Sequence, residues 1–137
     1  MKDQVAVIGI GCTKFGDRFE RSYEELICDA AFAAYDDAGI DPDDIEAAYL
    51  GTYIPGPGGG KSAVSLGDAL RLYGRPITRV ENYCATGTDA FRNACMAVAS
   101  GIRSSRAATR RPASSRSRRR ATCTRSAWAA RRSPRWR

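Results

Sequence analysis

Cys84 is the residue in this sequence with the best local setting for nucleophilic chemistry. It stands in the stretch ENYCATGTDAFRNAC, between a short apolar segment and a segment with helical periodicity. The N-terminus of a helix presents free N–H groups and a partial positive charge. Both favour the thiolate, which is the nucleophilic form of cysteine. On these features alone, a nucleophile and a buried packing residue remain equally good interpretations of Cys84.

The other cysteines lack this setting. Cys95 falls on the apolar face of the same predicted helix and is expected in the core, and Cys12 and Cys28 are expected to be packing residues. No two cysteines have CxxC spacing and the chain has no histidine. A metal site is therefore not predicted. Free thiols and the absence of a secretory signal predict a protein of the reducing cytoplasm.

Two glycine-rich stretches resemble nucleotide-binding motifs without matching them. Gly9 and Gly11 begin a GxG pattern, but Lys14 stands where the dinucleotide motif needs a glycine. In PGPGGGKS, Pro55 occupies the position of the first glycine of a phosphate-binding loop. The first stretch is therefore predicted to be a tight turn after a strand, and the second a surface loop.

Cys84 needs a strand before it and a helix after it, and the sequence predicts three such strand–helix units. Strands are expected at residues 5–11, 47–54 and 76–83. The predicted helix start and stop residues are Ser22 and Gly39, then Ser65 and Gly74, then Thr86 or Thr88 and Gly101. Asp41 and Pro42 predict a short capped turn after the first helix. The order β-α-β-α-β-α indicates an α/β fold with a parallel sheet.

The chain changes character after residue 101, so two regions are predicted, 1–101 and 102–137. Residues 1–101 hold all 15 acidic residues and carry a balance of −6, whereas residues 102–137 carry 13 Arg and no acid, within an overall net charge of +7. The second region has no apolar period and is expected to be disordered. No apolar run is long enough to cross a membrane, so no membrane association is predicted.

Three segments together resemble the N-terminal part of a thiolase. They are VAVIGIGCTKFG, AAYDDAGIDPDDIEAAYLGTYIPG and RVENYCATGTDAFRNACMAVASG. The similarity is to the sterol-carrier-protein-x and archaeal acetyl-CoA acetyltransferase types. The resemblance implies a portion of a five-layered αβαβα fold, an acyl-CoA thioester as substrate with no other bound cofactor, and a homodimer or homotetramer. It also implies that Cys84 is the acyl-accepting residue.

Other parts of the family's machinery do not match this sequence. The resemblance implies that a histidine activates the cysteine and that a second cysteine or equivalent base moves the substrate proton, both from the C-terminal half. This chain has no histidine, and residues 102–137 do not continue the family pattern. A nucleophile needs an adjacent base and a site prepared for developing charge. The chain is therefore predicted to be an incomplete thiolase that does not turn over.

The composition of residues 102–137 suggests an origin. A GC-rich gene read in a wrong frame yields Arg, Ala, Pro, Ser and Thr with occasional Trp, as found here. The hypothesis is that this region is translated out of frame after an insertion or deletion near codon 102. The alternatives are an Arg-rich arm that binds nucleic acid through its charge, and a non-catalytic subunit that pairs with an intact thiolase.

Overall fold

Seven short elements follow one another in the part of the chain that the structure, a computed structural model, describes: residues 4–56 and 59–101. In chain order they are α1 (Tyr23–Ala38), the 3-10 helix η1 (Pro42–Asp44), β1 (Ala48–Gly51), α2 (Val64–Leu70), β2 (Ile77–Val80), the 3-10 helix η2 (Tyr83–Ala85) and α3 (Thr86–Ala99). The predicted α/β class is confirmed.

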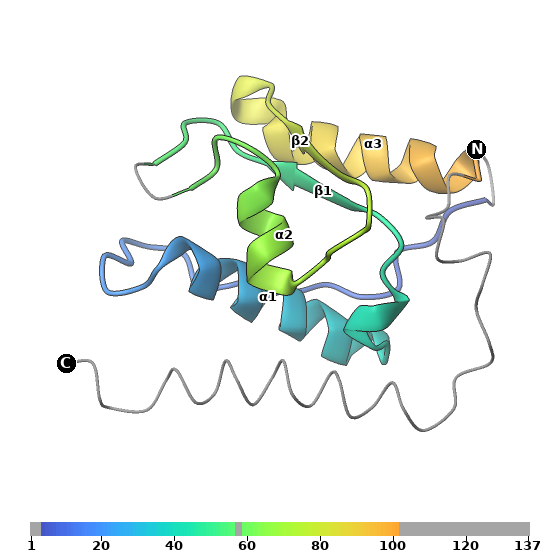
Figure 1. Ribbon diagram of the computed structural model, residues 1–137, viewed down its shortest axis with the longest axis horizontal. Helices are drawn as coiled ribbons and strands as arrows, with labels where there is room; N and C mark the ends of the chain where they lie inside the picture. The colour runs from blue at the N-terminus through green and yellow to red at the C-terminus, as the bar shows by residue number, and fades with distance from the viewer. Residues whose placement is uncertain (1–3, 57–58, 102–137) are drawn as a thin grey trace.

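The two strands pair in parallel and are covered by helices on both faces. The register places Ala48 opposite Ile77 and Gly51 opposite Val80. Helix α3 lies on one side of the strands, while α1 and α2 lie on the other (Figure 1). Because the strands are parallel, both end at the same edge of the sheet. That edge carries the segment that contains Cys84.

Helix α1 begins and ends where the sequence predicts. The Ser22 side chain accepts a hydrogen bond from the Glu25 N–H, and the Glu25 carboxylate accepts one from the Ser22 N–H, which completes a capping box. Gly39 has φ of 65° and forms the left-handed C-cap. The Asp41 and Pro42 turn is also confirmed, as the start of η1.

The prediction of a strand at residues 5–11 is wrong for this structure. The segment lies against α1 instead, and the Ile10 N–H donates to the Asp37 carboxylate at 2.9 Å. Its two glycines allow this close approach, since a Cβ on Gly11 would lie 1.9 Å from the Ala30 carbonyl oxygen. A strand requires a ladder of backbone hydrogen bonds to a neighbour. Here a backbone N–H bonds to an aspartate on the helix, and the sheet has two strands among the described residues.

The predicted limits of α2 and the predicted cap of α3 are also wrong. Helix α2 begins at Val64 and ends at Leu70, and its left-handed C-cap is Arg71 rather than the predicted stop residue Gly74. The Ser65 hydroxyl does not cap this helix, because it accepts a hydrogen bond from the Gly60 N–H at 3.1 Å. Helix α3 begins at Thr86 with no side-chain cap. The strands are shorter than predicted, with four residues each.

The core is small, and its cysteines differ from expectation in one case. The buried apolar residues of the described part are Cys28, Tyr35, Leu50, Leu66, Leu72 and Ala97. Cys28 packs as predicted, and its thiol donates to the Ala69 carbonyl at 3.3 Å. Cys12 is exposed, so the prediction that it packs is wrong. It follows the segment that lies on α1, where only glycine fits closely. Cys95 is half-buried at the edge of the core.

Residues 102–137 are outside the described residues, and so are the predictions that they are disordered and form a separate region. Among the residues that the structure does describe, no helix combines the length and apolar character needed to cross a membrane.

Candidate active site

The edge of the sheet where both strands end holds the candidate site. Strand β1 is followed by Thr52 and the glycine-rich loop, and β2 is followed by Glu81, Asn82 and η2. Cys84 is the middle residue of η2 and is exposed. The sequence placed Cys84 directly between a strand and a helix. The structure inserts one turn of 3-10 helix at that junction, which runs into α3 without a break.

Tyr83, immediately before Cys84, has an uncommon backbone conformation. Its φ is 45°, in the left-handed region that bulky residues rarely adopt. Its N–H donates to the Glu81 carboxylate at 3.3 Å. Its ring centroid lies 5.1 Å from that of Tyr53, which is in the segment after β1. Strained residues of this kind persist where their surroundings hold them, and they cluster at functional sites. The chain thus turns sharply just before the candidate nucleophile.

Thr86 holds that turn in place. Its hydroxyl donates to the Tyr83 carbonyl at 2.7 Å and accepts from the Asn82 N–H at 2.8 Å. Thr86 is only 6% exposed. The sequence predicts Thr86 as one of two alternative caps of helix α3. A cap would accept hydrogen bonds from the helix that follows it, whereas this hydroxyl bonds to the residues that precede it.

The start of α3 supplies the electrostatic setting of Cys84. Helix α3 has 14 residues and no side-chain cap, and the first turn of a helix presents N–H groups that lack partners within the helix. Its N-terminus therefore carries the partial positive charge of the helix dipole. The nearest acidic residue of the first turn, Asp89, forms an ion pair with Arg92 at 3.5 Å. An anion on Cys84 would lie at the favourable end of this helix.

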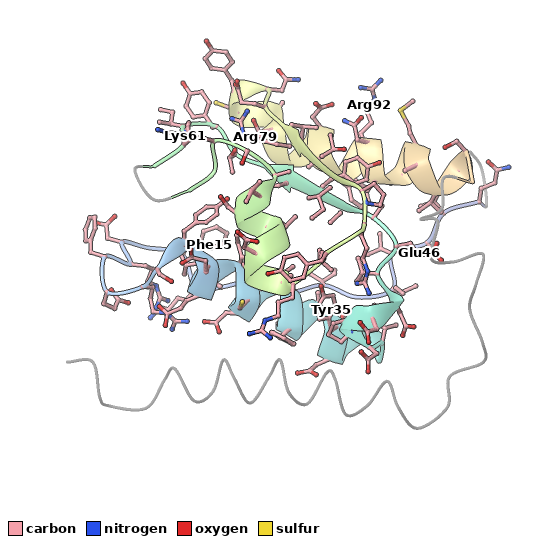
Figure 2. The ribbon with its side chains drawn as sticks, viewed as in Figure 1. Phe15, Tyr35, Glu46, Lys61, Arg79 and Arg92 are labelled. Atoms are coloured by element: carbon pink, nitrogen blue, oxygen red, sulfur yellow. The ribbon has the colours of Figure 1, made fainter. Side chains whose placement is uncertain are left out.

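Arg79 ties the glycine-rich loop to the sheet beside the site. Its Nε donates to the Thr52 hydroxyl at 2.8 Å and to the Gly60 carbonyl at 2.7 Å. Figure 2 shows Arg79 and Lys61 at the end of the molecule where the chain enters α3. The guanidinium is thus engaged by neutral oxygens of the loop. Lys61 is exposed, as expected of a residue in a surface loop.

One phenol packs against this loop. Burial raises the pKa of Tyr23 above its ordinary value, and the positive charge of Arg79 opposes that shift. The Tyr23 ring lies under Gly59, where an added Cβ would come within 2.9 Å of it. The glycine at this position therefore allows the loop to close over the tyrosine.

The described residues contain no group of three His, Cys, Asp or Glu side chains able to hold a metal ion. The given sequence has no histidine, so it supplies no imidazole as a base toward Cys84. The arrangement offers an accessible thiol at a helix N-terminus and lacks a general base of that type. It suits thiol addition to an activated carbonyl better than chemistry that must also move a substrate proton.

Comparisons with known proteins decide the family. The chain is 43% identical over 103 residues to an acetyl-CoA acetyltransferase of Methanocaldococcus jannaschii, which covers 74% of this chain and 26% of that protein. It is 41% identical over 103 residues to an acetyl-CoA acetyltransferase of Methanothermobacter thermautotrophicus, covering 74% and 27%. Sterol carrier protein 2 of Gallus gallus is 36% identical over 104 residues, covering 74% and 19%. No family model matches.

The matched part of this chain is a thiolase-type segment. Its fold agrees, because a 3-oxoacyl-[acyl-carrier-protein] synthase III from Aquifex aeolicus superposes with a TM-score of 0.53 at 20% identity, covering 61% of this chain and 27% of that chain. The resemblance read from the three sequence segments is thereby confirmed. The chain spans about a quarter of the length of the acetyl-CoA acetyltransferases it matches.

Within this thiolase-type segment, the structure brings together the glycine-rich loop and the Cys84 segment, which the sequence predicts only as separate features. The glycine-rich loop and the cysteine turn meet through Tyr53 and Tyr83. The conformation of Tyr83 and the double hydrogen bond of Thr86 were missed. The signal in the sequence is the run of small residues Ala85, Thr86 and Gly87 directly after Cys84.

Proposed function

We propose that Cys84 accepts an acyl group from an acyl-CoA thioester, the first half-reaction of a thiolase-type acyltransferase. The Cys84 sulfur attacks the thioester carbonyl, and a new carbon–sulfur bond forms as the bond to the CoA sulfur breaks. The proton of the Cys84 thiol leaves with the CoA thiol, so the step needs no oxidant or other reactant. The enzyme then carries an S-acyl cysteine.

One observation carries this proposal. Cys84 is an exposed thiol at the uncapped start of a 14-residue helix, in a segment 43% identical to an acetyl-CoA acetyltransferase. A helix N-terminus favours negative charge in general, and the thiolate is the nucleophilic form of cysteine. The turn at Tyr83 presents the sulfur to solvent, where a large thioester can reach it.

The carbon–carbon bond step is not expected from this polypeptide. That step requires a base that removes a proton from the second acyl group, and the chain has no histidine. We therefore expect acyl transfer to Cys84 without turnover of a 3-oxoacyl-CoA. The whole reaction requires groups beyond those in this sequence.

Acyl transfer is tested by mass spectrometry after incubation with acetyl-CoA. The expected result is one added acetyl group, located on the tryptic peptide formed by residues 80–92, whose single cysteine is Cys84. Cys84→Ser should abolish it, and Cys95→Ser should leave it unchanged. Hydroxylamine should remove the label, because a thioester is cleaved where an amide is not. A label that persists in Cys84→Ser, or no label on the wild-type chain, would reject the proposal.

We also propose that residues 102–137 are translated out of frame. The relatives match 74% of the chain and leave about a quarter unmatched, the same share that residues 102–137 make up. Sequencing the gene around codon 102 tests this idea. We expect a downstream frame that encodes thiolase-like sequence with a histidine, and the idea fails if no frame does so.

Oligomeric state and cellular location belong to the same proposal. We expect the thiolase-type segment to associate with copies of itself in the cytoplasm. Alternatively, it pairs with an intact thiolase subunit. Co-purification with such a subunit would support that alternative, and its failure would count against it. A monomer across a wide concentration range of the purified chain would count against self-association.

The balance of +13 in residues 102–137 favours one second candidate function, weak binding of nucleic acid. Counterion release makes such binding fall steeply with salt. Retention on heparin should then vanish when residues 102–137 are deleted. Retention that survives this deletion would exclude the tail as its cause.

A further inference from the structure

We infer that Thr86 is a positioning residue for Cys84, and this inference rests on the proposed function of that cysteine. The Thr86 hydroxyl ties the turn before Cys84 to the first residue of α3. It thereby sets where the sulfur lies relative to the helix N-terminus. Its role is exerted through the backbone of residues 82 and 83, and it needs no contact with the substrate.

The geometry uses both hydrogen-bonding capacities of the hydroxyl. It donates to the Tyr83 carbonyl at 2.7 Å and accepts from the Asn82 N–H at 2.8 Å. Asn82 and Tyr83, the two residues before Cys84, are therefore both hydrogen-bonded to Thr86, which lies two positions after it. Because Thr86 is 6% exposed, water is poorly placed to replace the hydroxyl. Removal of the oxygen would leave the Asn82 N–H without its partner, and the Tyr83 carbonyl would keep only its bond from the Thr86 backbone N–H.

The bond to Tyr83 opposes the strain in that residue. A tyrosine at φ of 45° relaxes toward negative φ unless its surroundings prevent it. The Tyr83 carbonyl is fixed by Thr86, and the Tyr83 N–H is bonded to the exposed Glu81 carboxylate at the longer distance of 3.3 Å. If the Thr86 hydroxyl is lost, the turn can rotate and move Cys84 away from the start of α3.

The sheet fixes the position of Thr86 in turn. Gly51 is the last residue of β1, and a Cβ there would lie 2.9 Å from the Thr86 Cγ2 and 3.1 Å from its carbonyl oxygen. The end of the strand therefore packs directly on this threonine. A hydroxyl held against the sheet can define the turn more rigidly than one on a free helix end.

The test compares alkylation of Cys84 by iodoacetamide in three chains: wild type, Thr86→Val and Thr86→Ser. The time profile of the reaction is followed near neutral pH on the peptide of residues 80–92. Thr86→Val should react about fivefold more slowly, the size expected when a helix-terminus interaction is lost. Thr86→Ser keeps the oxygen and should restore the wild-type profile. Alkylation of Cys95 in the same samples serves as the internal control and should not change.

The possible outcomes separate the inference from the proposed function. If wild-type Cys84 reacts no faster than it does in urea, the activated thiol itself is refuted. If wild-type Cys84 is activated but Thr86→Val has the same profile, only the positioning role of Thr86 is refuted. If Thr86→Val does not fold, Thr86→Ala removes the same hydroxyl without placing a methyl group against Asn82 and Tyr83. The same slower reaction is expected from it, and an unchanged profile would overturn the inference.

Discussion

At the scale of single residues, Tyr83 makes a prediction that reverses the usual order of two substitutions. In most positions glycine is less stable than alanine because it loses more entropy on folding. At φ of 45°, alanine keeps the steric cost of the left-handed conformation, about 1–2 kcal/mol, which glycine does not have. Tyr83→Gly should therefore unfold at a higher urea concentration than Tyr83→Ala. Both lose the contact with Tyr53, so that contact cancels, and the opposite order would mean that the turn is not strained.

Tyr35 makes a prediction about alkaline pH. Burial raises the pKa of this phenol above its ordinary value of 10.0, with the charge of Arg75 opposing the shift and Cys28 adding to it. The folded state then holds the proton more tightly than the unfolded state does. Stability is complete below about pH 10 and falls as the pH rises from there toward the raised value.

The measurement is the free energy of unfolding in urea at several pH values between about 8 and 11. Tyr35→Phe removes the titrating group and should flatten the decline above about pH 10. Burial also raises the pKa of Tyr23, so Tyr23→Phe is a matched variant for comparison. A decline that is as steep in Tyr35→Phe as in the wild type would show that the Tyr35 phenol does not contribute.

Residue-scale prediction from sequence worked for the local backbone setting of Cys84, which depends on its nearest neighbours. Cys84 was singled out from the helix that follows it, and the structure places it at a helix N-terminus with its thiol exposed. The left-handed Tyr83 was not predictable, because tyrosine disfavours that conformation and contacts with Thr86, Glu81 and Tyr53 hold it there. Those contacts depend on how the chain packs on Gly51.

At the scale of elements, the capping box of α1 gives a local test. Ser22→Ala removes the side-chain acceptor of the Glu25 N–H and should lower the free energy of unfolding by about 1 kcal/mol. Thr88→Ala is the matched control, because Thr88 is exposed in the first turn of α3, which has no side-chain cap. Urea unfolding should show no effect of this control beyond about 0.5 kcal/mol. Equal losses in both variants would mean that α1 does not depend on its cap.

The elements that were predicted correctly are those whose signals lie within a few residues of each other. Ser22, Glu25 and Gly39 define α1 through bonds inside the helix and its two ends. The segment at residues 5–11 has the composition of a buried strand, yet it lies on α1 through glycines and an aspartate 27 positions away from Ile10. Its pairing depends on which neighbours are available, and composition does not encode that.

At the scale of the whole molecule, more large apolar side chains of the described part are exposed than are buried in the core. Six apolar residues of the described part are buried, while many large ones are exposed, among them Ile10 at 73% and Phe91 at 56%. A groove between β1 and α3 is lined by Ile8, Ile45, Tyr49, Phe91 and Val98. Within the described residues, the sheet has two strands, so each has an open edge. Contiguous apolar surface of this kind and open strand edges favour association.

This surface leads to a prediction about the association of whole chains. Phe91→Glu places a charge on the groove and should move the equilibrium toward monomer, because each association would then have to desolvate a carboxylate. Phe19→Glu is the control, since Phe19 is 94% exposed and lies outside the groove. Sedimentation velocity across a concentration series should show a larger monomer fraction for Phe91→Glu and a wild-type distribution for Phe19→Glu. If both variants shift equally, net charge rather than the groove governs association, and if neither shifts, the groove is not a contact surface.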